Sequence, residues 1–157
     1  MQKYTDYRPN VAAIILSSEY PKKCEFMLSR RNGMKQGWQF PQGGIDKGES
    51  TVEALMRELK EEIGTNDVEI LAEYPEWITY DFPRATKGKL YPYKGQTQKY
   101  YLVRLRESAK IDLFAHEIPE FEEYRFVGME ELFKRATFLK RRAYRRVIDY
   151  FKKEGML

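Results

Sequence analysis

The chain has 157 residues, of which 42% are hydrophobic and 15% aromatic; this composition excludes an intrinsically disordered protein and predicts one folded domain over residues 1–157. Its 28 basic and 24 acidic residues leave a net charge of +4, too small to indicate a class of partner by itself. The single cysteine, Cys24, excludes an intrachain disulfide, and we expect it to be a half-buried apolar side chain in a reducing compartment.

Membrane and secretion signals are not found in the sequence. The longest apolar run, VAAIIL at 11–16, has the length of a strand and falls far short of the roughly 20 residues that cross a membrane. The residues before it, with Asp6, Arg8 and Pro9, do not form a signal peptide. We therefore expect a cytoplasmic protein with no membrane partner. No protein partner can be inferred from the sequence, and a monomer is compatible with it.

Hydrophobic periodicity and turn residues predict the order of the elements along the chain. Strands are predicted at 10–17 and 24–31, a short extended piece at 38–40, one long strand or two within 68–82, and further strands at 96–105 and 123–129. Between these lie a helix that follows residue 50, a long exposed loop at 81–95, and a helix from 130 to 153. The apolar stripe predicted for the last helix is Leu132, Phe133, Leu139, Tyr144, Val147, Ile148 and Phe151. This order predicts an α+β fold or a three-layer α/β/α sandwich around a mixed sheet.

The helix after residue 50 has clear signals at both ends. Ser50 and Glu53 form a capping-box pattern, so the helix should begin at Thr51, and Gly64 should end it in a left-handed conformation. At about 100° per residue, four apolar side chains gather on the face that packs on the sheet. These four are Val52, Leu55, Leu59 and Ile63.

Three glutamates, Glu58, Glu61 and Glu62, fall together on another face of this helix. Such a run is more often a solvated helix surface than a site. Like charges at this spacing repel, however, and a hard divalent cation such as Mg²⁺ would make the grouping favourable. The fork of donors on Arg57 could bind a carboxylate such as Glu49 and fix the preceding loop.

The full spacing adds to this interpretation. Gly43, Glu49, the run from Arg57 to Glu62, and Gly64 match the pattern G-x5-E-x7-R-E-U-x-E-E-x-G-U, where U is apolar. Only Thr65, at the last position, departs from it. The chain therefore resembles the Nudix hydrolases, and we refer to this segment as the Nudix box.

The resemblance implies an α/β/α sandwich around a mixed β-sheet that cleaves a nucleoside diphosphate linked to another group, with two or more Mg²⁺ or Mn²⁺ ions. It implies metal ligands at Glu58, Glu61, Glu62 and Gly43, and an organising pair of Glu49 and Arg57. Either Glu61 or Glu62 would be the base that activates water.

Outside the box, four segments resemble the bacterial RNA pyrophosphohydrolases, which overlap in sequence with asymmetric diadenosine polyphosphate hydrolases. The segments are 7–11, 38–44, 96–101 and 138–147. This resemblance implies substrate contacts from Arg8, Arg30, Gln42 and Lys140, and a further metal ligand at Glu120. Leu139 replaces the aromatic residue expected before Lys140, and Phe138 is a possible substitute for stacking a base.

Three functions follow from these patterns as hypotheses. The first is removal of pyrophosphate, or of successive phosphates, from the 5′-triphosphate or diphosphate end of single-stranded RNA, which promotes mRNA decay. The second is hydrolysis of a dinucleoside polyphosphate. The third, from a different class, is a non-catalytic RNA-binding module, which the intact set of glutamates disfavours. Taken singly, Arg8, Arg30 and the basic run 140–146 would be ordinary surface charges.

Overall fold

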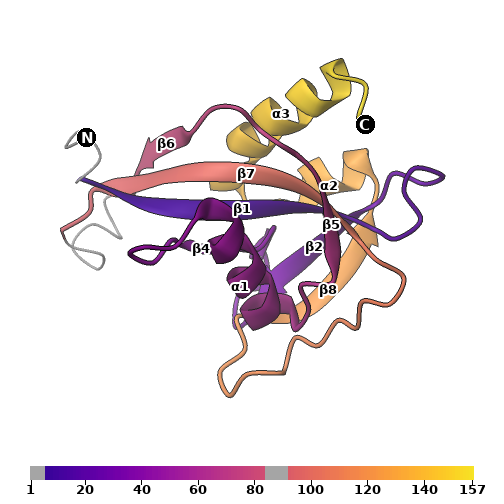
Figure 1. Cartoon of the computed structure of the whole chain (residues 1–157), viewed down its shortest axis with the longest axis horizontal. Helices are drawn as coiled ribbons and strands as arrows, with labels where there is room; N and C mark the ends of the chain where they lie inside the picture. Colours follow the sequence, from indigo (N-terminus) through magenta and orange to yellow (C-terminus); the bar gives the residue numbers. More distant parts are fainter. Residues whose placement is uncertain (1–5, 84–91) are drawn as a thin grey trace.

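The computed structural model describes residues 6–83 and 92–157, in which one mixed sheet is covered by helices on both faces (Figure 1). The strands are β1 (Tyr7–Leu16), β2 (Phe26–Arg31), β3 (Trp38–Gln39), β4 (Gln42–Gly44), β5 (Val68–Glu73), β6 (Ile78–Asp81), β7 (Gly95–Leu105) and β8 (Phe121–Val127). The helices are α1 (Thr51–Ile63), α2 (Met129–Arg135) and α3 (Phe138–Lys153). The predicted segment 68–82 is thus two strands, and residues 84–91 of the predicted loop lie outside the described residues.

The centre of the sheet is a long parallel pair, β1 and β7, in register from Tyr7 opposite Gly95 to Leu16 opposite Arg104. The other pairings are antiparallel: β2 and β4 pair with β1, β5 and β6 with β7, and β3 and β8 with β2. Because β4 pairs with residues 10–12 of β1, the Nudix box begins at Gly43 opposite Val11, in the middle of the central strand.

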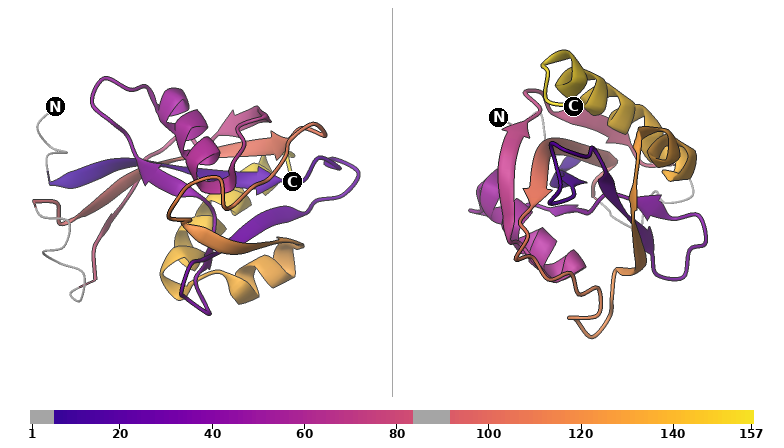
Figure 2. Two further views of the ribbon diagram at one scale, coloured as in Figure 1. Left: turned by 90° about the horizontal axis from the view of Figure 1, so that it is seen from below. Right: turned by 90° about the vertical axis from the view of Figure 1, so that its right-hand side faces the viewer.

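The alternation of side chains along β1 creates two apolar cores. Ala12, Ile14 and Leu16 enter the core that α2 and α3 cover, and the intervening residues 11, 13 and 15 enter the core that α1 covers. Figure 2 shows α3 and α1 on opposite sides of the sheet. The predicted α/β/α sandwich is therefore confirmed.

Helix α1 has the predicted ends. The Ser50 side chain accepts a hydrogen bond from the Glu53 backbone N–H, the Glu53 side chain accepts one from the Ser50 backbone N–H, and Gly64 follows the helix with φ 79°. The prediction for Val52 is wrong, since 41% of its surface is exposed while Ala54 is buried. The buried face of α1 includes Ala54 and Glu62 but not Val52, so a stripe drawn through the apolar residues alone misplaces it.

The predicted helix from 130 to 153 is wrong in one respect, because it is two helices. Ala136 and Thr137 are extended between α2 and α3, Ala136 forms a parallel bridge with Trp38, and the Thr137 N–H donates to the Trp38 carbonyl at 3.0 Å. This tertiary pairing with β3 outweighs the local helical pattern.

Two predictions of burial are also wrong. Leu139 is 72% exposed, because the first turn of α3 projects past the core that residues 144, 147, 148 and 151 fill. Cys24 is exposed rather than half-buried, because it lies outside the sheet in the connection between β1 and β2. Among the described residues, no helix is long and apolar enough to span a membrane.

Candidate active site

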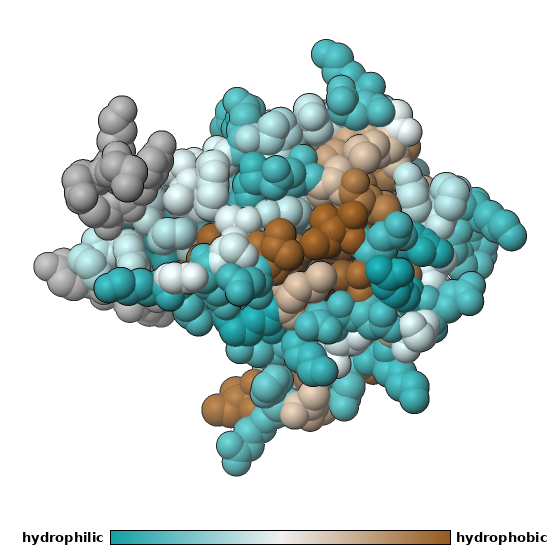
Figure 3. Space-filling model, viewed as in Figure 1, coloured by the Kyte–Doolittle hydropathy of each residue, from teal (hydrophilic) through white to brown (hydrophobic). Residues whose placement is uncertain are grey.

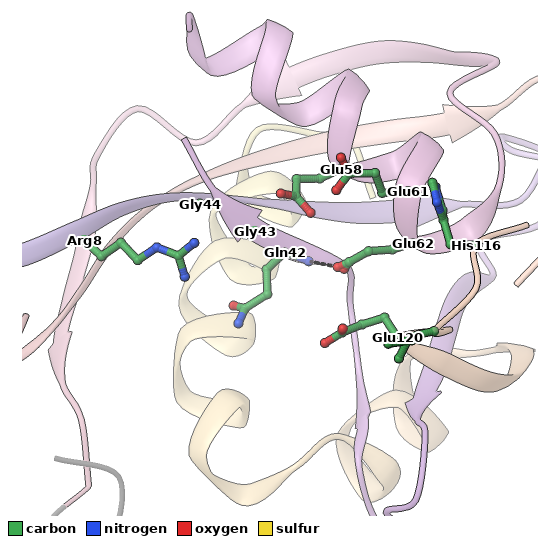
Figure 4. Close-up of a pocket in the computed structure, with 10 residues that line it drawn as sticks. Arg8, Gln42, Gly43, Gly44, Glu58, Glu61, Glu62, His116 and Glu120 are labelled. Carbon is green, nitrogen blue, oxygen red and sulfur yellow. Dashed lines mark hydrogen bonds between the residues drawn. The ribbon is translucent and has the colours of Figure 1, made fainter. Parts of the chain in front are cut away.

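A cavity of about 450 Å³ opens where β1, β4, α1 and the loop before β8 meet. It is lined by Arg8, Gln42, Gly43, Gly44, Glu58, Glu61, Glu62, His116, Ile118 and Glu120. Figure 4 shows the four glutamates on one side and Arg8 reaching in from β1 on the other. One wall is therefore acidic and the facing wall basic, an arrangement that suits a polyphosphate together with cations.

Arg57 organises the acidic wall from behind. Its Nε and Nη2 donate to the two oxygens of Glu49 at 2.7 and 2.8 Å, Nη1 donates to Glu58 Oε1 at 2.8 Å, and Nη2 also donates to the Gly44 carbonyl at 2.9 Å. The Arg57 hydrogen bonds lower the pKa of Glu49 to about 2, and Glu49 in turn raises the pKa of Arg57. The geometry matches the pair that the sequence predicts, while its role in catalysis stays a prediction.

Two consecutive glycines in β4 leave the space that two charged side chains occupy. A Cβ on Gly43 would lie 1.9 Å from Glu58 Cδ, and a Cβ on Gly44 would lie 2.3 Å from Arg8 Nη2. Any larger residue at either position would displace a side chain that lines the cavity. The glycines thus allow the strand to pass close to the carboxylate and the guanidinium.

Glu62 is the most buried of the glutamates and is 6% exposed. Its Oε1 accepts a hydrogen bond from the Gln42 backbone N–H at 3.3 Å, whereas no donor in the described part of the chain reaches its buried Oε2. Burial, followed by the negative charges of Glu58 and Glu120, raises the pKa of Glu62 well above its usual range. Burial also raises the pKa of Glu58, against the opposing effect of Arg57.

These carboxylates have the chemistry of a site for a hard divalent cation, although they are not drawn together. Within residues 6–83 and 92–157, no three His, Cys, Asp or Glu side chains form a ready metal cluster. The atoms that these glutamates offer to a metal are nevertheless all oxygens, and Glu62 Oε2 is buried and accepts no hydrogen bond from the described residues. A divalent cation among these carboxylates would give Glu62 Oε2 a partner and would lower the repulsion between the negative charges. The residues of the cavity therefore fit a divalent cation.

A network of polar side chains holds Gln42 at the edge of the cavity. Lys140 Nζ donates to Gln42 Oε1 at 2.6 Å, and Gln98 Nε2 donates to the same oxygen and to Asn10 Oδ1 at 2.9 Å. Burial and the charge of Arg31 lower the pKa of Lys140 to about 8. Lys140 is thus tied to the cavity through Gln42.

The structure places Arg30 away from this cavity. Its guanidinium pairs with Glu122 and Glu123 and lies 5.9 Å from the Trp38 ring centroid. The next residue, Arg31, lies 3.2 Å from Glu120, one of the glutamates that line the cavity. Arg30 and Arg31 are consecutive residues of β2, so their side chains point to opposite faces of the sheet.

Sequence reasoning also missed His116 and Ile118. Both lie in the loop from β7 to β8, which projects from the body of the molecule and carries apolar atoms at its tip (Figures 1 and 3). Ile118 is 86% exposed although it lines the cavity. The loop lacks periodicity, so the only available signal was its position directly before Glu120.

Comparison with known proteins now decides the family. The NUDIX domain model matches residues 6–150. The chain belongs to the Nudix hydrolase family.

Two relatives of this Nudix hydrolase are similar over nearly their whole length. An RNA pyrophosphohydrolase of a Sulfurovum species is 63% identical over 157 residues and covers 100% of both chains. An RNA pyrophosphohydrolase of a Nitratiruptor species is 62% identical over 149 residues, 95% of this chain and 96% of its own.

Solved structures of lower sequence identity share the Nudix fold. A C. elegans Ap4A hydrolase in a binary complex superposes with a TM-score of 0.64 at 22% identity, covering 92% of this chain and 98% of that chain. At this identity the likeness supports the architecture, and the choice of substrate depends on the cavity of this Nudix hydrolase itself.

Proposed function

We propose that this Nudix hydrolase is a metal-dependent RNA 5′ pyrophosphohydrolase. It converts a 5′-triphosphate or diphosphate end into a 5′-monophosphate by releasing pyrophosphate or successive phosphates, which promotes decay of the transcript in the cytoplasm. The full-length similarity to RNA pyrophosphohydrolases supports this choice. The observation that carries it is the cavity that sets four glutamates against Arg8, with Lys140 tied to its floor through Gln42.

The carboxylates of Glu58, Glu61, Glu62 and Glu120 would hold two or more Mg²⁺ or Mn²⁺ ions, together with the backbone of Gly43. Bound divalent ions would supply the positive charge that neutralises the polyphosphate and favours deprotonation of the attacking water. Arg57 keeps Glu58 aimed at the cavity, because its Nη1 bonds Glu58 while its other nitrogens are fixed by Glu49. Its role is to position the wall, not to contact the phosphates.

The base is Glu61 or Glu62, and their surroundings differ. The Glu61 side chain is 45% exposed and is restrained by one 3.5 Å contact with Arg57 Nη1, so it can accept a proton from a water that enters from solvent. Glu62 Oε2 is buried and accepts no hydrogen bond from the described residues, so it suits either a cation or a proton. The two Gln variants, assayed separately, distinguish the base from a residue that only holds a cation.

On the opposite wall, Arg8 can bind phosphate oxygens with its planar fork of donors, and Lys140 adds a point charge. Gln42 accepts hydrogen bonds from Lys140 and Gln98, which fixes its amide orientation at the cavity. These residues hold one part of the polyphosphate while another part lies against the glutamates of the acidic wall.

The deciding experiment compares kcat/KM for a 5′-triphosphate RNA and for a diadenosine polyphosphate, each with Mg²⁺. We expect the RNA to be the better substrate. A strong preference for the dinucleotide would overturn the proposal in favour of the alternative hydrolase. Tight binding of triphosphate RNA without any phosphate or pyrophosphate release would favour the RNA-binding module.

A further inference from the structure

His116 is the only histidine of the chain, and the proposed function gives it no role although it lines the catalytic cavity. Among the described residues that line this cavity, Arg8, Gln42 and His116 are the only ones whose side chains carry an N–H donor. Figure 4 shows Arg8 and His116 at opposite ends of the cavity, with the glutamates of α1 between them. A polyphosphate that Arg8 holds at one end is therefore directed toward His116.

The strand β4 supports this order along the cavity. A Cβ on residue 44 would lie against Arg8, a Cβ on residue 43 would lie against Glu58, and the N–H of residue 42 donates to Glu62. At about 3.3 Å per strand residue, these three points of contact span roughly 7 Å. The negative charge of Glu120 acts on Glu62, so the loop that carries Glu120 and His116 lies at the Glu62 end of the series.

The loop from β7 to β8 is anchored on both sides of His116. On one side, the Asp112 N–H donates to the carbonyl of Ile63, the last residue of α1, at 2.9 Å. On the other side, the Asn32 side-chain amide and backbone N–H donate to the carbonyls of residues 119 and 120 at 3.3 and 2.9 Å. Residues 113–118, which we call the arch, connect these two anchors. Because both ends of this short arch are fixed, His116 is held beside the glutamate wall before a substrate binds.

The His116 side chain is free to bind an anion. It is exposed, and within residues 6–83 and 92–157 it forms no hydrogen bond or ion pair. A neutral imidazole has one N–H and an imidazolium has two, so His116 can donate to a phosphate oxygen in either state. Such a bond to an ionised acceptor is roughly twice as strong as one between neutral groups. Ile118, the other residue of the arch that lines the cavity, has no polar side-chain group that would compete for the phosphate.

The number of phosphates decides whether a substrate reaches His116. With its nucleoside end held at Arg8, a 5′-triphosphate extends one phosphate further along the glutamates than a 5′-diphosphate. We propose that His116 binds the terminal phosphate of the triphosphate, a contact that the diphosphate is too short to make. His116 is thus a specificity-determining residue. This inference rests on the proposed RNA function and deepens it, because it names the residue that distinguishes the two kinds of 5′ end.

The test compares kcat/KM for one RNA sequence that carries either a 5′-triphosphate or a 5′-diphosphate end, each with Mg²⁺. His116→Ala removes the N–H donor, so we expect kcat/KM for the triphosphate to fall about tenfold and kcat/KM for the diphosphate to stay unchanged. His116→Gln keeps an N–H donor and should recover part of the loss. The matched control is Phe114→Ala in the same arch. Because Phe114 is 64% exposed and does not line the cavity, this variant should affect neither substrate.

Thermal unfolding of both alanine variants should match that of wild type, because both side chains are exposed. If His116→Ala lowers kcat/KM for the two RNAs equally, more for the diphosphate, or for neither, the inference is overturned while the proposed function stands. An equal fall together with a higher Mg²⁺ requirement would make His116 a metal ligand instead. If wild type hydrolyses neither RNA, the proposed function fails, and this inference fails with it.

Discussion

Replacing Gly43 with alanine tests whether the acidic wall depends on the close approach of β4. The new Cβ would lie 1.9 Å from Glu58 Cδ and 2.2 Å from both carboxylate oxygens. To reach an ordinary contact of 3.4 Å, the carboxyl group must move by about 1.5 Å. The backbone at Gly43 lacks a positive φ, so alanine itself adds no conformational strain and the effect comes from this displacement alone.

The displacement has two measurable consequences. It breaks the 2.8 Å hydrogen bond from Arg57 Nη1 to Glu58 Oε1, and a bond between charged groups contributes about 1.5–3 kcal/mol. For a domain of this size, that loss corresponds to a fall in Tm of roughly 3–12 °C. A group misplaced by about 1 Å costs on the order of 100-fold in rate, so kcat should fall at least that much.

The assay pairs thermal unfolding with Mg²⁺-dependent release of pyrophosphate or phosphate from 5′-triphosphate RNA. Gly128→Ala is the control, because nothing lies within 4 Å of its added Cβ and its φ of −78° accommodates alanine. The control should keep wild-type activity. If Gly43→Ala kept kcat within about threefold of wild type, the reasoning from close approach would be refuted.

Three further predictions concern the charged groups of the site. Burial raises the pKa of Glu62, so the folded protein loses stability as pH rises above the pKa of about 4.3 that this group has in the unfolded chain. At pH 7 without metal, Glu62→Gln should therefore raise Tm by a few degrees, and it should lower kcat by about 10²–10⁴. Mg²⁺ should raise the Tm of wild type more than that of the variant. The opposite sign in thermal unfolding would show that the carboxylate is not penalised by burial. Because the pKa of Lys140 is about 8, KM for RNA should rise between about pH 7 and 9 as its charge is lost; Lys140→Arg should abolish that rise, and Lys140→Ala should reduce the salt slope by about 0.7. An identical pH profile in the arginine variant would assign the rise to another group. Arg57→Lys cannot hold both oxygens of Glu49 and also Glu58, so kcat should fall about 100-fold, with KM changing less than kcat; a change confined to KM would instead place Arg57 against the substrate.

The local architecture of the Nudix box could be predicted because its signals are local. The capping box at Ser50, the left-handed Gly64 and the Glu49–Arg57 pair depend on residues within about one helix length of one another. The order of the longer strands and the position of α1 followed in the same way from periodicity, whereas β4 was not predicted. The three-layer arrangement then follows from the need to bury both faces of the sheet.

The features that sequence reasoning missed depend on contacts between distant segments. The break between α2 and α3 exists because the backbone of residues 136 and 137 pairs with Trp38 of β3. The periodicity within 130–153 does not indicate that contact. Arg30 lies outside the lining of the catalytic cavity because its guanidinium pairs with Glu122 and Glu123, which lie far from it in the sequence. His116 reaches the cavity only because its loop folds back beside α1.

The parallel pairing of β1 with β7 also has a consequence for synthesis of the chain. Tyr7 is paired with Gly95, so the central strand emerges 88 residues before its main partner. At the usual translation rate of about 5–20 residues per second, the apolar segment 11–16 therefore waits roughly 4–18 s with one edge unpaired. During this interval, its exposed edge is open to pairing with other chains. Arg8 and the glutamates of α1 can consequently come to opposite walls of one cavity only after β7 has been made, so the site forms late in folding.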